Sequence, residues 1–336
     1  MQTKRLKDDK NGIVAAAKIL KSGGIVAIPT ETVYGLAASA FDDAAIEKIF
    51  AAKGRPQDNP LIVHISDLSM IEQVAADFSG KAEELAKAFW PAALTLVLKK
   101  GKKIANSVSR GLDTVAVRMP NCEVARQIIN ETGIPLAAPS ANISGSPSPT
   151  SYEHVIADLD GKIDAVVCSV SSEIGLESTV VSLVSNPPRL LRPGGITPEQ
   201  LLEYLPDLEI DKAVLEELEK GQKAASPGMK YRHYSPKTEV FLVEAEDEAF
   251  YNFVNSKKNA AAICFLEDED NIIIKTLCYG KKGSDKEQAK ALFSILRSVD
   301  GLGVGEVYVR APEKKGIGLA VYNRLIRAAG FKVIRL

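Results

Sequence analysis

The sequence predicts an α/β protein made of two units, and two observations support this expectation. Short apolar runs typical of strands alternate with helical stretches along the 336 residues. A loop with two prolines and a glycine at 225–236 interrupts the alternation, which starts again at Glu239. We therefore expect a larger unit at 1–208, a linker at 209–238 and a smaller unit at 239–336.

The larger unit is expected to contain a strand at Ile25–Pro29, an almost entirely apolar run. Asp43 follows as the expected N-cap of a helix. A later helical stretch should end at Trp90, because Pro91 lacks the N–H that a continuing helix requires. Further strands are expected at Leu61–Ile65, Leu94–Leu98, Thr114–Arg118, Leu136–Ala138, Ala165–Cys168, Ser178–Val184 and Arg189–Leu191.

The smaller unit repeats the alternation after a charged stretch, Asp211–Lys223, that is expected to be helical. Strands are expected at 239–243, 261–265, 272–276, 306–310 and 332–335, with helices at 285–297, at 317–329 and between the first two strands. This order over about 100 residues is typical of a small Rossmann-like domain.

Composition limits the classes of function. Hydrophobic residues make up 46% and charged residues 25%, as in soluble globular proteins, and the formal net charge is −1. Nucleic acid would therefore have to bind a local patch. The four cysteines form no CxxC pair, which favours reduced thiols over disulfides or a zinc site. We see no secretory signal and no apolar run of about 18 residues, so a cytoplasmic location without membrane contact is expected.

The first polar loop, Ile28–Leu36, follows an expected strand, where α/β proteins usually bind ligands. Thr30, Thr32 and Tyr34 stand at alternate positions, so extended backbone would place their hydroxyls on one face. A β-turn with ordinary hydroxyl capping would account for the same residues.

The second loop, Lys53–Leu61, carries a lysine and an arginine two residues apart at a helix end. Lys53 and Arg55 suit an anion site, because arginine offers a planar fork and lysine a point charge. They would also serve as ordinary basic residues at a helix C-terminus. His64 lies in the apolar strand that follows, where a core histidine is more common than a ligand-binding one.

Two further loops carry dense polar sequence. The loop Pro139–Pro149 offers hydroxyls and free backbone N–H groups, a common way to hold polyphosphate, although a flexible Ser/Pro linker has similar composition. In the other polar site, Ser178 opens a strand, and Arg192 ends the next strand before two glycines. An arginine between apolar neighbours and a tight turn is costly to bury unless an anion meets it.

Several common motifs are missing from the sequence. It has no P-loop, no G-x-S-x-G elbow, no HExxH and no His/Cys metal cluster. The glycines of Gly301–Gly305 precede an expected strand rather than a helix, so they are no dinucleotide fingerprint.

The loops together carry a resemblance. Seven short motifs occur in the order typical of the YrdC/Sua5 family of threonylcarbamoyl-AMP synthases. They are PTETVYGL, KGRP with NPL, PAALTLVL, VAVRMP, APSANISG, ESTVV and LRPGG. SPGMKYRHYSP and the second α/β unit resemble the linker and C-terminal domain of the longer Sua5 type. The resemblance implies an open, twisted α/β sheet with a concave cationic cavity.

The resemblance also implies site residues. The L-threonine pocket would contain Thr32, His64, Arg118, Ala138 and Ser178. The ATP contacts would be Arg55, Asn59, Thr114, Ser140, Asn142, Ser148, Arg192 and, from the linker, Tyr231, which is easily confused with Tyr234. Lys53 and Arg55 would act on bicarbonate or the carbamate and are the expected catalytic residues. Residues 225–236 are expected to close over the nucleotide as a lid.

The implied reaction joins L-threonine, bicarbonate and ATP into threonylcarbamoyl-AMP and pyrophosphate, for the t6A modification of tRNAs that read ANN codons. Mg²⁺ would enter with ATP and be held mainly by phosphates, with no tightly bound protein metal. The expected downstream partner is the TsaD/Kae1-type tRNA threonylcarbamoyl transferase machinery, and a weak tRNA contact is possible.

Two alternatives remain open. A direct RNA-binding module would use the basic residues Lys53, Arg55, Arg118, Arg192, Lys230 and Arg232, but the chain is near neutral, has 6% aromatic residues and shows no RNP or KH signature. A carbamoyl-adenylate former of the hydrogenase-maturation type would need an acylphosphatase domain and zinc-finger cysteines, which this sequence lacks.

Overall fold

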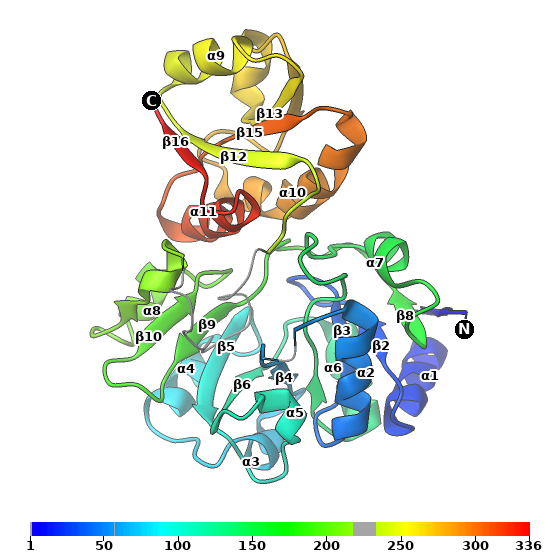
Figure 1. Cartoon of the computed structure of the whole chain (residues 1–336). Helices are drawn as coiled ribbons and strands as arrows, with labels where there is room; N and C mark the ends of the chain where they lie inside the picture. Colours follow the sequence, from blue (N-terminus) through cyan, green and yellow to red (C-terminus); the bar gives the residue numbers. More distant parts are fainter. Residues whose placement is uncertain (1, 57, 218–232) are drawn as a thin grey trace.

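The computed structural model describes residues 2–56, 58–217 and 233–336. The chain forms two α/β units, each built on its own sheet. In Figure 1 the larger unit is drawn below the smaller one. The expected α/β class with an open mixed sheet and a smaller second unit is confirmed. None of the helices in the described ranges is both long and apolar enough to cross a membrane.

The larger unit contains an 11-stranded sheet of order β1-β8-β2-β3-β7-β4-β6-β5-β9-β10-β11. The sheet is mixed: β4, for example, pairs with β6 in parallel and with β7 antiparallel. The strands are β1 (Lys4–Lys7), β2 (Val26–Ile28), β3 (Gly35–Ser39), β4 (Ile62–His64), β5 (Leu94–Lys99), β6 (Thr114–Arg118), β7 (Leu136–Ala137), β8 (Ala165–Cys168), β9 (Thr179–Ser182), β10 (Arg189–Arg192) and β11 (Glu209–Ile210).

Helices pack against this sheet and close its core. They are α1 (Lys10–Lys21), α2 (Asp43–Lys53), α3 (Ile71–Val74), α4 (Lys81–Phe89), α5 (Asn106–Ser109), α6 (Glu123–Thr132), α7 (Tyr152–Leu159) and α8 (Pro198–Leu202), with 3-10 turns η1 (Leu68–Met70) and η2 (Lys212–Val214). The central strands β2, β3 and β4 are buried along their whole length, which explains their continuous apolar sequences.

Helix α2 is important because it delivers Lys53 to the site. Its N-cap is Asp42, whose carboxylate accepts hydrogen bonds from the N–H groups of Ala44 and Ala45, so the prediction of Asp43 was wrong by one residue. Asp43 instead accepts a hydrogen bond from the N–H of Ser107 at 2.8 Å, which ties α2 to α5. The helix ends at Gly54, whose φ of 59° is left-handed.

The smaller unit contains a five-stranded sheet, β14-β13-β15-β12-β16, in which every pair is parallel. Its strands are β12 (Glu239–Glu244), β13 (Ala260–Cys264), β14 (Lys275–Cys278), β15 (Glu306–Arg310) and β16 (Val333–Arg335). Its helices are α9 (Asp247–Asn255), α10 (Asp285–Ser298) and α11 (Gly316–Ala328), with 3-10 turns η3 (Leu266–Asn271) and η4 (Val299–Leu302). Separate apolar clusters cover its two faces, one under α10 and α11 and one under α9.

Every strand predicted from the sequence is present, with bounds shifted by up to three residues. The sequence analysis missed β1, α1, β3, α5, α6, α7, α8 and β11. The helix expected at Asp211–Lys223 was wrong for its described part, because Lys212–Val214 is a 3-10 turn and 215–217 are not helical. Strand β11 pairs with β10, so the large sheet continues past residue 208 into the range expected for the linker.

The two units meet along α10 and α11, which lie on the side of the smaller unit that faces the larger one (Figure 1). Arg297 of α10 forms an ion pair with Asp158 of α7, with 2.8 Å between Nη2 and Oδ2. Gly175, with a φ of +79°, lies so close to α10 that an added Cβ would be 2.6 Å from the Cα of Lys290. This contact leaves no room for a side chain and shows that the units pack tightly here.

Candidate active site

A cavity opens in the larger unit where several strands begin or end, with about 740 Å³ of space free of protein atoms when its part open to solvent is included. Thr32 follows β2, His64 ends β4, Arg118 ends β6 and Arg192 ends β10. The polar loop after β7 forms another wall.

Most residues that the sequence singled out meet in this cavity. It is lined by Thr32, Lys53, Arg55, His64, Arg118, Ala138, Ser140, Asn142, Ser148, Ser178 and Arg192. Asn59 and Thr114 do not line it. Asn59 is buried, and its Oδ1 has no hydrogen-bond partner among the described residues. Thr114 opens β6 and lines a separate, smaller pocket with Pro60 and Val108. Tyr231 lies outside the described residues.

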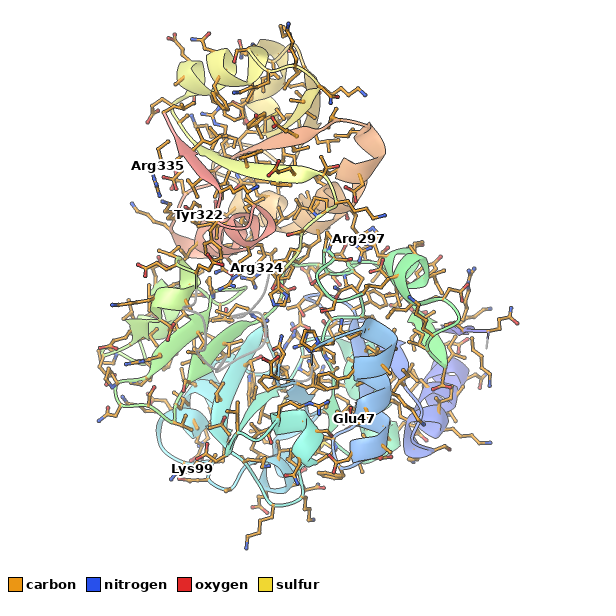
Figure 2. The ribbon with its side chains drawn as sticks, viewed as in Figure 1. Glu47, Lys99, Arg297, Tyr322, Arg324 and Arg335 are labelled. Carbon is orange, nitrogen blue, oxygen red and sulfur yellow. The ribbon has the colours of Figure 1, made fainter. Side chains whose placement is uncertain are left out.

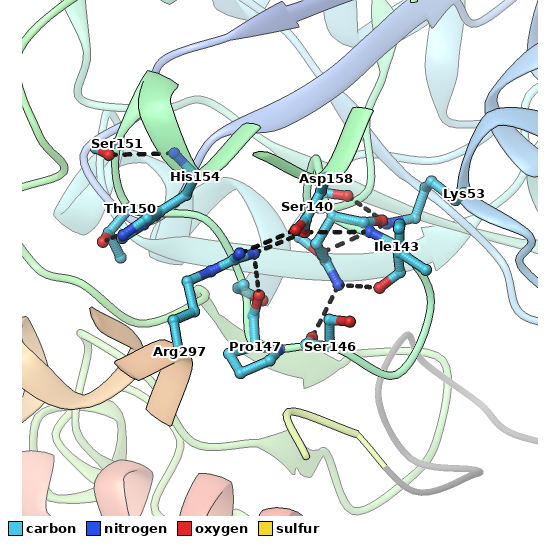
Figure 3. A network of polar contacts seen from close by, with 12 residues as sticks. Lys53, Ser140, Ile143, Ser146, Pro147, Thr150, Ser151, His154, Asp158 and Arg297 are labelled. Carbon is cyan, nitrogen blue, oxygen red and sulfur yellow. Dashed lines mark hydrogen bonds and ion pairs between the residues drawn. The ribbon is translucent and has the colours of Figure 1, made fainter. Parts of the chain in front are cut away.

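Lys53 is 1% exposed and holds the polar loop with its ammonium group. Its Nζ donates to the carbonyl oxygens of Ser140 at 2.5 Å and Asn142 at 2.6 Å (Figure 3). Burial, and secondarily the charge of Arg55, holds the pKa of this lysine well below its usual value. Lys53 therefore has a structural task in this loop in addition to any contact with a reactant.

The polar loop is ordered by its own hydrogen bonds. Ser140 donates to Asn142 Oδ1 at 2.6 Å, and Asn142 Nδ2 donates to the carbonyl oxygens of Ile143 at 2.7 Å and Ser146 at 2.9 Å (Figure 3). Arg297 reaches it from α10 and donates to Pro147 O at 2.6 Å. These contacts argue against a flexible linker and leave the loop preorganised around the cavity.

Arg118 is fixed in place before any ligand arrives. Its Nη2 lies 2.6 Å from Glu31 Oε1, Nη1 donates to Thr32 Oγ1 at 2.8 Å, and Nε donates to Ala92 O at 3.2 Å. Guanidinium has further N–H donors, so part of its capacity remains for a carboxylate. Glu31 also accepts from the N–H of Asn121 at 2.9 Å, which fixes the carboxylate that holds Arg118.

His64 is a neutral hydrogen-bonding group at the cavity wall. It is 5% exposed, and its Nδ1 has no hydrogen-bond partner among the described residues. Burial and the charge of Arg118 lower its pKa to about 3. It therefore stays uncharged at neutral pH and can present an unprotonated or protonated ring nitrogen according to the tautomer.

Arg55 and Arg192 bring positive charge into the same cavity. Burial lowers the pKa of each to about 10, so both remain protonated at neutral pH. Arg192 donates through Nε to Ser178 O at 3.0 Å and through Nη2 to Ser178 Oγ at 3.2 Å. A guanidinium that keeps its charge at the wall of a cavity favours an anionic ligand there.

The sequence reasoning overlooked some cavity residues. Glu177 lines the cavity but was assigned no role, and His233 and Tyr234, which also line it, were expected only as part of the lid at 225–236. Tyr234 is 5% exposed and packs on Phe293 of α10 with 5.1 Å between ring centroids. The available signals were the acidic residue in ESTVV and the similarity of Tyr231 and Tyr234 within one short motif.

An open α/β sheet whose strand ends collect buried cations defines a protein that binds anionic small molecules. Comparison with known families makes this class specific. The family model Sua5_yciO_yrdC, described as "Telomere recombination", matches residues 18–194, and the model Sua5_C, described as "Threonylcarbamoyl-AMP synthase, C-terminal domain", matches residues 196–330. The chain belongs to the YrdC/Sua5 family, in its longer two-domain Sua5 form.

Individual relatives cover nearly the whole chain. The threonylcarbamoyl-AMP synthase of Pyrococcus abyssi is 43% identical over 332 residues, which are 96% of this chain and 95% of the relative. That of Bacillus subtilis is 42% identical over 339 residues, 99% of this chain and 97% of the relative. The crystal structure of P. abyssi Sua5 complexed with L-threonine superposes with a TM-score of 0.91 at 41% identity, covering 100% of both chains.

Proposed function

We propose that this protein synthesises threonylcarbamoyl-AMP from L-threonine, bicarbonate and ATP, with release of pyrophosphate. The observation that carries the proposal is the gathering of Lys53, Arg55, Arg118 and Arg192 in one buried cavity. Two substrates are anions and the third carries a carboxylate, so a preorganised cationic cavity suits all of them. The synthase activity named for full-length relatives agrees with this chemistry.

The reaction needs two steps. The threonine amine, having lost a proton, attacks the carbon of bicarbonate and gives a carbamate with loss of water. Attack on CO₂ gives the same carbamate with loss of a second proton from nitrogen. A carbamate oxygen then attacks the α-phosphate of ATP, and pyrophosphate leaves. Negative charge develops on the phosphoryl oxygens in the second step, where fixed cations are most effective. No side chain has to form a covalent intermediate.

The assignment of residues to substrates is part of the proposal. Arg118, held by Glu31, is placed to bind the threonine carboxylate, while Thr32, His64 and Ser178 are placed for its hydroxyl and amine. Arg55, Arg192 and the polar loop suit the triphosphate, with Lys53 beside the point of carbamate attack. Ala138 borders the pocket and can offer backbone groups.

Asn59, Thr114 and Tyr231 are retained as expected ATP contacts, although neither Asn59 nor Thr114 lines the cavity. The expected lid at 225–236 has only residues 233–236 within the described ranges and stays a prediction.

Mg²⁺ enters this scheme as part of the Mg-ATP substrate. Among the described residues that line the cavity, Glu177 is the one carboxylate, and it is occupied by Ser148 and Arg324. Phosphate oxygens and water would therefore supply most ligands of the ion. The described chain has no cluster of three or more His, Cys, Asp or Glu suited to a metal.

We further propose that the product serves t6A formation in tRNA in the cytoplasm, by transfer through TsaD/Kae1-type machinery. The alternative of a direct RNA-binding module is less well supported, because Lys53, Arg118 and Arg192 are buried and their charge faces a small cavity. An RNA backbone needs basic residues on an accessible surface.

Product analysis tests the proposed function. Mass spectrometry of reactions with ATP, labelled bicarbonate and a panel of amino acids should detect labelled threonylcarbamoyl-AMP. Pyrophosphate release should require threonine and bicarbonate and should not respond to RNA. Serine should lose roughly 1–3 kcal/mol for its missing methyl group, and valine more, because it leaves buried polar groups unpaired. Equal use of valine and threonine would contradict the threonine pocket.

A further inference from the structure

We propose that Arg324, which belongs to the smaller unit, is a positioning residue of the active site. It acts through Glu177 to hold Ser148 as a hydrogen-bond acceptor for the nucleoside part of ATP. The inference rests on the proposed function in taking ATP as the ligand, and it gives the second unit a direct role in nucleotide recognition.

Arg324 crosses from α11 into the larger unit and is completely buried, with 0% exposure. Its Nε lies 2.9 Å from Glu177 Oε2, and Nη2 donates to Glu177 O at 3.3 Å. Nη1 donates to Pro193 O at 2.6 Å, in the glycine turn after Arg192. Figure 2 places this side chain at the junction of the two units. Because the five N–H donors of a guanidinium have a fixed geometry, Arg324 on α11 determines where the Glu177 carboxylate lies.

Glu177 is 7% exposed and lines the cavity. Burial acts to raise its pKa, but Arg324 and Arg192 outweigh burial, so the pKa is lower than usual and the side chain is a carboxylate. A lone carboxylate would repel ATP from this cavity. Paired with Arg324, it leaves the positive charge of the cavity available to the phosphates.

Ser148 depends on this carboxylate for its orientation. Its hydroxyl is hydrogen-bonded to Glu177 Oε1, and the residue is 0% exposed at the cavity wall. An ionised carboxylate only accepts hydrogen bonds, so Ser148 must donate its proton to Glu177. The lone pairs of Ser148 Oγ are then what a ligand meets.

The direction of this hydrogen bond selects a part of ATP. Phosphate oxygens are acceptors, so they gain nothing from a second acceptor. The ribose hydroxyls and the adenine amino group are the donors that ATP carries. Ser148 therefore recognises the nucleoside, and the triphosphate belongs beside Arg55 and Arg192.

A second contact from the smaller unit supports this arrangement. Arg297 of α10 donates to Pro147 O, the carbonyl directly before Ser148, and is itself fixed by Asp158 (Figure 3). The backbone and the hydroxyl of the same loop segment are thus both held by helices of the second unit.

The first test measures ATP affinity by titration calorimetry in the full-length protein, together with KM and kcat. Arg324→Met should raise the dissociation constant and the KM for ATP roughly ten-fold, the worth of one well-placed hydrogen bond, with a smaller change in the KM for threonine. Adding Glu177→Gln should recover much of the loss, because the charge that needed Arg324 is gone.

Arg327→Met is the matched control. Arg327 lies on the same helix and donates across the junction to Ala213 O at 2.6 Å, whereas the ion pair with Glu177 among the described residues is made by Arg324. The Arg327→Met substitution should lower the melting temperature without changing the affinity for ATP. If both arginine variants weaken ATP binding equally, or if the double variant shows no recovery, Arg324 serves only to join the units and the inference is wrong.

Ser148→Ala with ATP analogues tests the same idea without disturbing the junction. Compared with ATP, the wild type should bind one class of analogue more weakly. This class is either the deoxy analogues, which lack a ribose hydroxyl, or purine riboside triphosphate, which lacks the amino group. Ser148→Ala should abolish that one preference. If the variant instead loses affinity equally for all of them and for inorganic pyrophosphate, Ser148 contacts phosphate and the inference is overturned. Binding is measured without turnover, so failure to form product would contradict the proposed function separately.

Discussion

Each unit buries an arginine at the end of a strand, and the two arginines behave in opposite ways. Arg192 ends β10 with 6% exposure, and Arg310 ends β15 with 4%. Burial lowers the pKa of Arg192 to about 10. Burial acts on Arg310 too, but Asp247 and Asp268 outweigh it, so its pKa is raised. Both carboxylates form ion pairs with Arg310 within the smaller unit.

The difference separates a structural charge from a functional one. Arg310 brings its counter-ions with it, so the smaller unit gains nothing electrostatic from an external anion there. Arg192 and Arg55 lie where burial opposes their charge, and a bound anion would relieve that penalty. Charge at Arg192 and Arg55 therefore faces a cavity that a substrate anion can enter, whereas charge at Arg310 is paired within its own unit.

Removing a functional charge should affect catalysis far more than folding. Arg55→Ala should reduce the rate of pyrophosphate release at least about 100-fold, because a charge-assisted contact inside a site is worth on the order of 3 kcal/mol. The melting temperature of this variant should not fall, because the substitution removes a charge that burial destabilises in the folded protein. A near-normal rate would contradict the proposed role of Arg55.

Lys53→Ala should lose a similar factor in rate, but it should also lose stability, because Lys53 donates to the carbonyl oxygens of Ser140 and Asn142. Denaturant titration separates the two variants. If Lys53→Ala matched Arg55→Ala in stability, the loop would not depend on Lys53.

Removing a structural charge should do the reverse. Arg310→Met leaves Asp268, which is 1% exposed, without its counter-ion, and should lower the free energy of unfolding by about 3 kcal/mol. The specific activity of the protein that remains folded should be close to normal. Adding Asp268→Leu should recover stability, because buried pairs can be replaced by apolar residues. A large loss of kcat in a folded Arg310→Met protein would contradict the separation of roles.

The same distinction explains what the sequence could and could not predict. Strands and the loops after them were predictable because apolar runs and polar insertions are local patterns. Eleven of the expected site residues meet in one cavity, because most of them lie at strand ends of one sheet or in the loops beside them, and the end of α2 brings Lys53 to the same place. Helices such as α1 and α6 were missed although their amphipathic periodicity was present in the sequence.

Charge pairing was not predictable, because partners are remote in the chain. Arg118 meets Glu31, and Glu177 meets Arg324, at separations that no local motif encodes. Exposed and buried arginines also look identical in sequence. The fold therefore decides which cation forms ion pairs within its own unit, as Arg310 does, and which lines a cavity, as Arg192 does.

His64 should make the larger unit sensitive to acid. The unfolded chain binds a proton there near pH 6.5, whereas the folded protein resists it until about pH 3. Stability is therefore lost as the pH falls between these values, with about 2 kcal/mol lost at pH 5 relative to neutral pH. His64→Gln should remove this increment, measured as the difference in unfolding free energy between pH 7.5 and 5 in the two proteins.

The position of the histidines sharpens this test. All three histidines, His64, His154 and His233, precede the smaller unit. Near-ultraviolet and hydrogen-exchange probes of the smaller unit should accordingly change less on mild acidification than those of the larger unit. If His64→Gln and the wild type lost stability in parallel as the pH fell, His64 would titrate normally in the folded protein.

The smallest expected difference lies in how the two units begin a helix. Asp42 caps α2 through two hydrogen bonds, whereas Ser284 before α10 makes no side-chain capping bond. Asp42→Ala should therefore lower the free energy of unfolding by about 1 kcal/mol, and Ser284→Ala by less than about 0.5 kcal/mol. Asp42→Asn is the matched control, since an amide oxygen can accept the same bonds, and it should retain most of the stability.

Because α2 carries Lys53 at its other end, a frayed start of the helix should also make hydrogen exchange faster through its first turn without changing the KM for ATP. Equal losses for Asp42→Ala and Ser284→Ala would mean that the capping bonds of α2 contribute no more than the serine that caps nothing, and the two helix starts would then differ only in geometry.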